Sequence, residues 1–210
     1  MGIKSARFEH LLLTDADCVP ASSEWLARMV RGFEGGKEVV LGYSPYEKHP
    51  GWLNKKIRFE TLLTAIQYLS YALARIPYMG VGRNLAYLKK LFIENKGFSS
   101  HHHIISGDDD LFINQVAKGK KTKVVVHPDA FTCSEPKKTA EHWRFQKKRH
   151  LSTGKYYKKG HQFLLGLYAM SHFMVFISII PCILFHQWYW LSGALFLLRW
   201  LVQFIVFERC

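Results

Sequence analysis

The chain has 210 residues, with 29 Lys and Arg against 16 Asp and Glu, a formal net charge of +13, and 49% hydrophobic residues. This composition excludes an intrinsically disordered chain and a disulfide-stapled mini-protein. The four cysteines include no C-x-x-C pair, so neither a zinc site nor a disulfide framework is indicated. The excess of positive charge predicts a partner or surface that is anionic.

Strand-like and helix-like patterns alternate through residues 1–135. The short apolar runs Phe8–Thr14, Lys37–Gly42 and Thr122–His127 are predicted to be strands. A helix is predicted from Trp25 onward, after a Ser-Ser-Glu start signal. Trp52–Ile76 is predicted to be a long helix that is either well buried or lies along a membrane surface. This alternation predicts an α/β fold built on a sheet.

The C-terminal part of the chain is apolar, and Arg199 is its only charged residue between Phe163 and Phe207. Residues 163–185 and 188–207 are each long enough, at about 1.5 Å per residue, to cross a hydrocarbon core of about 30 Å. We therefore predict a transmembrane helical hairpin. The basic segment 136–162 precedes it, and the positive-inside rule then predicts a multi-pass protein of the cell (inner) membrane with residues 1–135 in the cytoplasm.

An acidic pair follows the first predicted strand. Asp15 and Asp17 are one residue apart, and a strand delivers both to the edge of a sheet where α/β proteins bind ligands. Two hard oxygen ligands suit Mg²⁺ or Mn²⁺ that bridges a diphosphate. Alternatively, both aspartates cap a turn before the next helix.

A second acidic group is the run Asp108, Asp109 and Asp110. Adjacent carboxylates repel one another, which predicts a raised pKa or a bound cation, and either suits a base that takes a proton from a hydroxyl. Alternatively, the run caps a helix that begins near Leu111 and favours its macrodipole. The two interpretations are compatible. The nearby triplet at 101–103 is interpreted as a polar loop, because three consecutive histidines converge poorly on a metal.

A third group is the basic run at 142–150. Gln146 and Arg149 are spaced i, i+3 on one helical face, so they can hold a diphosphate together. Alternatively, this charged run is a solvated face that contacts anionic lipid.

The order of these groups resembles the catalytic core of processive-type family 2 glycosyltransferases, the clan of cellulose, hyaluronan and chitin synthases. The features that carry the resemblance are, in order, an aspartate pair after a strand, Gly82-Arg83-Asn84, Gly-Asp-Asp-Asp, Gln-x-x-Arg, and apolar spans. The resemblance implies part of a Rossmann-like GT-A fold in residues 1–135, followed by an interfacial Q-x-x-R helix in 136–162. It also implies that the chain starts within the catalytic domain.

The resemblance also implies roles for individual residues. Asp15 and Asp17 would bind the metal, Mg²⁺ or Mn²⁺, and the diphosphate of the donor. The later acidic group supplies the base: alignment on Gly107 nominates Asp109, whereas alignment on Leu111 nominates Asp108. We prefer Asp109, with Asp110 as the third member of the group.

The Gln-x-x-Arg helix is implied to close over the diphosphate. Gln146 and Arg149 match that pattern, and His150 stands where the family has tryptophan, while Arg83 and Asn84 are included among the substrate-binding residues. The implied partners are a nucleotide-sugar donor such as a UDP-sugar, a glycan or lipid-linked acceptor, and an anionic membrane surface. The implied activity is membrane-bound, inverting sugar transfer, as in the synthesis of a cell-envelope polysaccharide.

Two other classes of protein share some of these features. The run Asp15-Ala-Asp17-Cys18-Val19 also resembles the strand end of haloacid-dehalogenase-type phosphatases, but their second acidic pair, about four residues apart, is not recognisable after Gly107. A membrane-anchored basic binding module explains the positive charge but not two ordered acidic groups. Nucleic acid is not an expected partner, because the sequence has no ribonucleoprotein pattern and no Cys/His finger.

Overall fold

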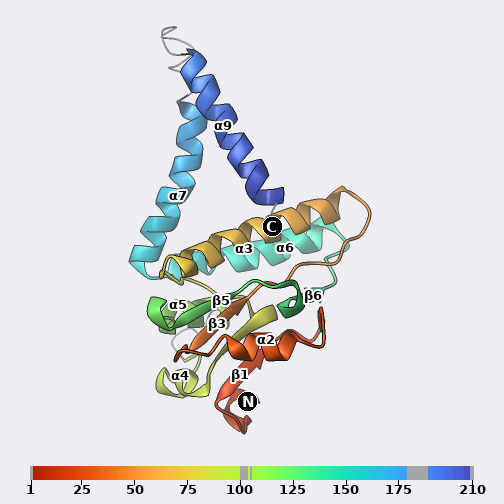
Figure 1. Ribbon diagram of the computed structural model, residues 1–210, viewed down its shortest axis with the longest axis vertical. Helices are drawn as coiled ribbons and strands as arrows, with labels where there is room; N and C mark the ends of the chain where they lie inside the picture. Colours follow the sequence, from red (N-terminus) through yellow and green to blue (C-terminus); the bar gives the residue numbers. More distant parts are fainter. Residues whose placement is uncertain (1, 100–103, 105, 179–188, 209–210) are drawn as a thin grey trace. The chain divides into compact units, whose positions relative to one another are not determined.

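The computed structural model describes residues 2–99, 104, 106–178 and 189–208. The chain divides into two compact units, Met1–Lys158 and Lys159–Cys210 (Figure 1). All of the acidic and basic groups singled out in the sequence belong to the first unit, including most of the basic segment 136–162.

The first unit is built on a mixed four-stranded sheet, which confirms the α/β prediction for this part of the chain. The strand order is β1-β4-β3-β5, with β4 antiparallel to both of its neighbours and β3 parallel to β5. Three of the strands lie within the predicted runs. The strands are β1 (His10–Leu13), β4 (Leu85–Leu88), β3 (Val39–Gly42) and β5 (Thr122–Val125).

Helices cover both faces of this sheet. Successive residues of a strand point to opposite sides, so each face carries side chains that pack against a helix. On one face, α2 (Trp25–Arg31) packs Met29 against Val40 of β3 and Ala86 of β4. On the other face, α5 (Asp110–Val116) places Phe112 with its ring centroid 5.0 Å from that of Tyr87. The core of the first unit therefore lies on both sides of β3 and β4.

Two longer helices, α3 (Trp52–Leu73) and α6 (Ala140–Leu151), lie side by side (Figure 1). Ile57 of α3 and Trp143 of α6 form a buried cluster with Tyr46. Lys147 of α6 also forms an ion pair with Glu60 of α3 at 3.4 Å. The predicted long helix is confirmed, and it buries one side against the sheet and α6.

Several short elements complete the first unit. A two-stranded antiparallel sheet, which the sequence did not predict, joins β2 (Cys18–Pro20) to β6 (Thr132–Ser134). The remaining elements are α1 (Gly2–Ser5), η1 (Gly82–Asn84), α4 (Lys89–Glu94), η2 (Gly119–Lys121), η3 (Pro128–Ala130) and η4 (Gly154–Tyr156).

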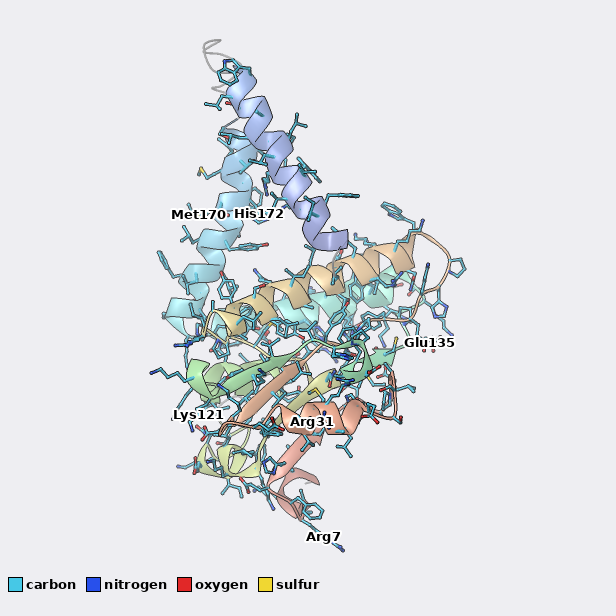
Figure 2. The ribbon with its side chains drawn as sticks, in the orientation of Figure 1. Arg7, Arg31, Lys121, Glu135, Met170 and His172 are labelled. Carbon is cyan, nitrogen blue, oxygen red and sulfur yellow. The ribbon has the colours of Figure 1, made fainter. Side chains whose placement is uncertain are left out.

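Most charged side chains of the first unit lie on its surface, although Asp110 is buried. Arg7, Arg31, Lys121 and Glu135 are exposed examples (Figure 2). The positive charge of the chain is therefore available to anionic partners.

The second unit contains α7 (Lys159–Ile177) and α9 (Tyr189–Glu208). Among the residues that the structure describes, no helix combines the length and apolarity needed to cross a membrane. The prediction of a transmembrane hairpin at 163–185 and 188–207, and with it of a multi-pass inner-membrane protein, is therefore wrong for the described helices. The first apolar segment forms only part of a helix that begins at Lys159, and residues 179–188 lie outside the described chain. Arg199 and Gln203 lower the hydropathy of α9.

Candidate functional site

The aspartate pair lies where β1 ends. The backbone N–H of Cys18 donates to the carbonyl oxygen of Asp15 at 3.0 Å, which closes a tight turn after the strand. One ligand atom from each of Asp15, Asp17 and Cys18 lies within 4.8 Å of the others. The structure therefore brings the two predicted metal ligands together and adds a thiol that the sequence did not indicate as a ligand.

Arg83 lies beside this turn, in η1. The hydroxyl of Thr14 donates to the Arg83 carbonyl oxygen at 2.9 Å, which ties the end of β1 to η1. The Arg83 guanidinium lies over the ring of Tyr46, 4.2 Å from its centroid, and its Nη1 donates to Ser134 Oγ at 2.9 Å. The side chain is thus fixed by a cation–π contact and a hydrogen bond, and it retains further N–H donors.

Asn84 follows Arg83 in η1 and is buried, with 1% exposure. Its Nδ2 donates to the carbonyl oxygens of Tyr43 and Ala130, both at 2.8 Å, and its Oδ1 accepts from Trp25 Nε1 at 3.1 Å. A side chain at Gly42 would collide with this amide. Asn84 therefore joins three segments of the first unit and supports η1 from below.

We expect Asn84→Ala to lower the free energy of unfolding by about 3 kcal/mol, because two buried carbonyls and an indole N–H lose their partner. Chemical denaturation measures this change. Asn95→Ala is the matched control: among the described residues the Asn95 side chain bonds to one group, the carbonyl of Leu91 in the helix that Asn95 caps, so we expect a loss below about 1 kcal/mol. Equal losses in the two variants would contradict a joining role for Asn84.

The acidic run begins at an exposed residue, Asp108, and continues into the N-terminus of α5. Asp109 is the N-cap, and its Oδ1 accepts from the backbone N–H of Asp110 at 2.7 Å. Its Oδ2 accepts from the backbone N–H of Gly82 at 2.6 Å. The predicted capping role is confirmed, and the second bond places Asp109 against η1, next to Arg83.

Asp110 points away from solvent, with 8% exposure. Its Oδ2 accepts from the Thr153 hydroxyl at 2.5 Å and from the Tyr157 hydroxyl at 2.7 Å. Its Oδ1 accepts from the backbone N–H of Leu111 at 2.7 Å. This carboxyl therefore fastens the segment that follows α6 to the start of α5.

The three site residues predicted in α6 differ in their exposure and their contacts. Gln146 Nε2 donates to the hydroxyl of Tyr46 at 3.3 Å, and its buried Oε1 has no hydrogen-bond partner in the described part of the chain. Arg149 and His150 are exposed. Desolvation, and then the positive charge of Arg149, lower the pKa of His150 and disfavour its charged form. Tyr46 thus contacts both Arg83 and Gln146.

The electrostatic interactions of Asp15 identify the charged groups that act on it. Partial desolvation raises the pKa of Asp15, and the negative charges of Asp17 and Asp108 raise it further. The positive charges of Arg83 and Arg149 lower the same pKa. These five residues come from the end of β1, η1, the acidic run and α6, and we call them the charge cluster.

Asp109 is half-buried beside the charge cluster. Desolvation raises the pKa of Asp109 to about 6, helped by the negative charges of Asp110 and Asp108 and opposed by the N–H donors of Gly82 and Asp110. A carboxyl with this pKa is mostly ionised at neutral pH and is still basic enough to accept a proton.

The structure thus brings together predicted residues from four parts of the sequence. Asn84 and Asp110, in contrast, make buried hydrogen bonds within the protein. The triplet 101–103 lies outside the described residues. The sequence had no local signal for the residues that hold the site in place, because their partners are far away along the chain. These residues are Tyr46, Ser134, Thr153 and Tyr157.

The ligand atoms at the end of β1 fit a small divalent cation. Asp15 and Asp17 are exposed, so their oxygens can be shared with waters and with a phosphate. That arrangement suits Mg²⁺ or Mn²⁺, which take oxygen ligands and keep several waters. The Cys18 sulfur, 3.8 Å from Asp17 Oδ1, is a softer ligand that Mg²⁺ does not favour.

Comparison with known protein-family models found no match to this chain, and comparison with curated proteins found none either.

Proposed function

We propose that this protein transfers a sugar, with inversion, from a nucleotide-diphosphate sugar such as a UDP-sugar to a hydroxyl of a glycan or lipid-linked acceptor. One observation carries this proposal: the charge cluster gathers three carboxylates and two arginines from distant parts of the chain, with Asp109 next to it. Such a transfer needs charge neutralised on the leaving diphosphate and a proton removed from the acceptor.

The arginines suit the first requirement. Arg83 is held by Tyr46 and Ser134 and keeps N–H donors for phosphate oxygens. Arg149 is exposed on α6 and acts on the same carboxylate, Asp15. Because arginine stays charged at all relevant pH values, the two side chains can bind a diphosphate from two sides.

The carboxylates suit a cation. The negative charge of Asp17 raises the pKa of Asp15, and the two carboxylates would repel a diphosphate if nothing lay between them. In our proposal they hold Mg²⁺ or Mn²⁺, which when bound supplies positive charge to the leaving group.

Asp109 suits the second requirement better than Asp108 does. Asp108 is exposed and acts on Asp15, so it lies toward the carboxylate pair. Asp109 is half-buried, is fixed by two backbone N–H donors and has a pKa near 6. In our proposal Asp109 accepts the proton of the acceptor hydroxyl.

Binding of Mn²⁺ and of uridine diphosphate to the purified chain, measured by calorimetry, tests this function. We expect the wild-type chain to bind the nucleotide only with the cation present. The double variant Asp15→Asn/Asp17→Asn should weaken that binding by at least about 100-fold, because removing two direct ligands exceeds the usual effect of losing a second-sphere partner.

The matched control is Glu34→Gln/Glu94→Gln, which removes two exposed carboxylates outside the site. We expect it to bind as the wild type does. Cation-independent nucleotide binding, or unchanged binding in the aspartate double variant, would count against the proposed site. A different nucleoside diphosphate that binds in the same cation-dependent way would change the donor but keep the reaction class.

A further inference from the structure

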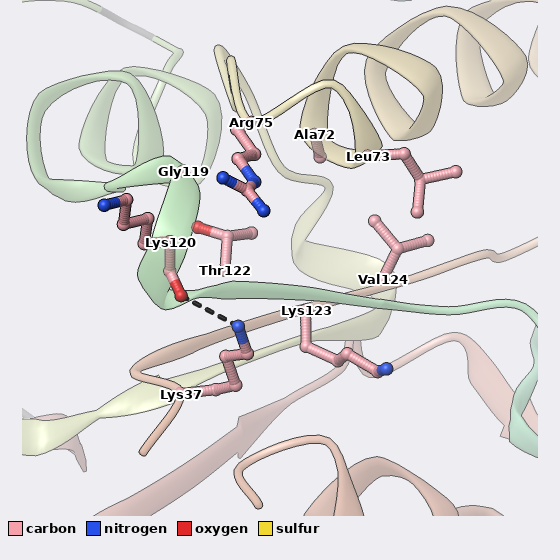
Figure 3. Close-up of a pocket in the computed structure, with 9 residues that line it drawn as sticks. All are labelled: Lys37, Ala72, Leu73, Arg75, Gly119, Lys120, Thr122, Lys123 and Val124. Carbon is pink, nitrogen blue, oxygen red and sulfur yellow. Dashed lines mark hydrogen bonds between the residues drawn. The ribbon is translucent and has the colours of Figure 1, made fainter. Parts of the chain in front are cut away.

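A cavity of about 500 Å³, away from the charge cluster, lies between the end of α3 and the start of β5 (Figure 3). Its walls come from the end of α3, the chain before β3, η2 and the first part of β5. Four of its side chains are basic: Lys37, Arg75, Lys120 and Lys123. No acidic residue lines it.

Strand direction separates this cavity from the charge cluster. In the parallel pair, Val39 lies opposite Thr122 at one end and Gly42 opposite Val125 at the other. Gly42 packs on Asn84, which supports η1, whereas Thr122 lines the cavity. No residue of the charge cluster lines the cavity, and the two ends of these strands are about 10 Å apart, so the cavity is a separate place on the molecule.

The cations of the cavity are poorly compensated. Lys37 Nζ donates to the carbonyl oxygen of Lys120 at 2.8 Å (Figure 3). The side chains of Arg75, Lys120 and Lys123 have no hydrogen-bond or ion-pair partner among residues that the structure describes. Like charges gathered around one cavity repel one another and attract an anion.

The acidic residue next to Lys37 in the chain does not neutralise this cavity. Glu38 follows Lys37 in the chain, but its carboxylate lies 3.2 Å from Lys90 Nζ and 3.9 Å from Lys121 Nζ. Lys121, at the surface in Figure 2, also donates to the carbonyl oxygen of Gly36. Glu38 is therefore already paired with two lysines outside the cavity.

The backbone that carries Arg75 is fixed. Arg75 has a φ of 64°, a left-handed conformation that is rare outside glycine and needs support from its surroundings. The Arg75 carbonyl packs closely against Gly119, where any side chain would collide with it. The Arg75 N–H also donates to the Ala72 carbonyl oxygen at 3.0 Å. The guanidinium is therefore presented from a rigid base.

One wall of the cavity is apolar. It consists of Ala72, Leu73 and Val124, of which Leu73 is 70% exposed. A cationic side next to an apolar wall suits a ligand with a compact, highly charged group attached to a less polar body.

We propose that this cavity binds the phosphate groups of a small phosphorylated molecule. Its volume is within the range of small-molecule sites, roughly 300–1,000 Å³. Arginine and lysine together are the side chains that recognise phosphate, and a diphosphate carries enough negative charge to offset several of them. This inference does not rest on the proposed sugar transfer.

Calorimetric titration with inorganic pyrophosphate, in the presence of a chelator and at fixed ionic strength, tests the proposal. The chelator removes the contribution of cations at the charge cluster. Arg75→Gln/Lys123→Gln should weaken pyrophosphate binding by about 10-fold or more, because two charge-assisted contacts are lost. Lys48→Gln/Lys55→Gln, which removes two exposed charges elsewhere, should change it by less than about twofold.

A second readout locates the ligand directly. Pyrophosphate should protect Lys37, Lys120 and Lys123 from acetylation, measured by mass spectrometry, and should leave Lys48 unprotected. Absence of pyrophosphate binding, or equal weakening in both double variants, would overturn the proposal. Loss of binding in Arg149→Gln would move the bound phosphate to the charge cluster and would also overturn it.

Discussion

Replacing Asp109 by asparagine is expected to lower the rate of sugar transfer by about 10³-fold, the usual contribution of a general base. Asparagine is nearly isosteric and can keep one of the two backbone bonds of Asp109, to Gly82 or to Asp110. Its amide cannot accept the proton of the acceptor hydroxyl. We therefore expect the affinity for the donor to change little. Release of nucleoside diphosphate with and without acceptor, together with donor binding, measures both quantities.

Asp108→Asn is the matched control for this experiment. The negative charge of Asp108 raises the pKa of both Asp15 and Asp109, so its removal should lower both pKa values and alter cation affinity, but it leaves the proton acceptor Asp109 in place. If Asp108→Asn abolished transfer while Asp109→Asn retained it, the base would be Asp108 and our choice between the two would be wrong.

The pH profile gives an independent readout of the same group. Asp109 accepts a proton only when ionised, and its pKa lies near 6. Transfer by the wild-type chain should therefore decline as the pH falls through about 6 and should be maximal above it. A rate that stayed constant down to pH 5 would exclude Asp109 as the base.

Local patterns predicted the elements that carry the candidate site. The apolar run before Thr14 forms β1, and the aspartates after it lie at the end of that strand as expected. Asp109 caps α5, as predicted for an acidic residue before a helix. These predictions succeeded because each depends on neighbours within a few residues.

Long-range contacts could not be predicted in this way. Tyr46 contacts Arg83 and Gln146, which lie 37 and 100 residues further along the chain. Asn84 was predicted to bind substrate. Its amide instead forms hydrogen bonds with Trp25 and Ala130, and nothing in the surrounding sequence indicates these partners. Pairing of β2 with β6 likewise joins two three-residue strands far apart in sequence.

The membrane prediction failed for the described helices for a different reason. It counted charged residues, and Arg199 was the only one in a long stretch. Hydropathy also depends on polar uncharged side chains, and α9 contains Ser192 and Gln203. The boundaries of a helix matter as well, since α7 begins at Lys159, before the apolar residues.

The second large effect is expected at Asp110, which holds two distant parts of the first unit together. Asp110→Ala should lower the free energy of unfolding by about 4 kcal/mol, because the Tyr157 hydroxyl and the Leu111 N–H lose a buried acceptor. Chemical denaturation measures this loss. A loss below about 1 kcal/mol would show that the bonds contribute little.

Two milder variants separate the packing role of Asp110 from its charge. Tyr157→Phe removes one hydrogen bond to Asp110 and keeps the carboxylate, so it should cost about 1–2 kcal/mol of unfolding free energy and leave the pH profile unchanged. Asp110→Asn keeps the shape and removes the negative charge that raises the pKa of Asp109. That pKa should fall, and the acidic limb of the profile should move below pH 6.

The direction of this shift distinguishes a positioning residue from a purely structural one. If Asp110 served only to fasten the segment after α6, both mild variants would change stability and neither would move the acidic limb. If the limb moves in Asp110→Asn alone, the buried carboxylate also sets the basicity of its neighbour. Asp110 bonds to Thr153 and Tyr157 beyond α6, so the residue that tunes Asp109 would also hold the helix that carries Arg149. The proposed base and one proposed diphosphate ligand would then depend on the same buried contact.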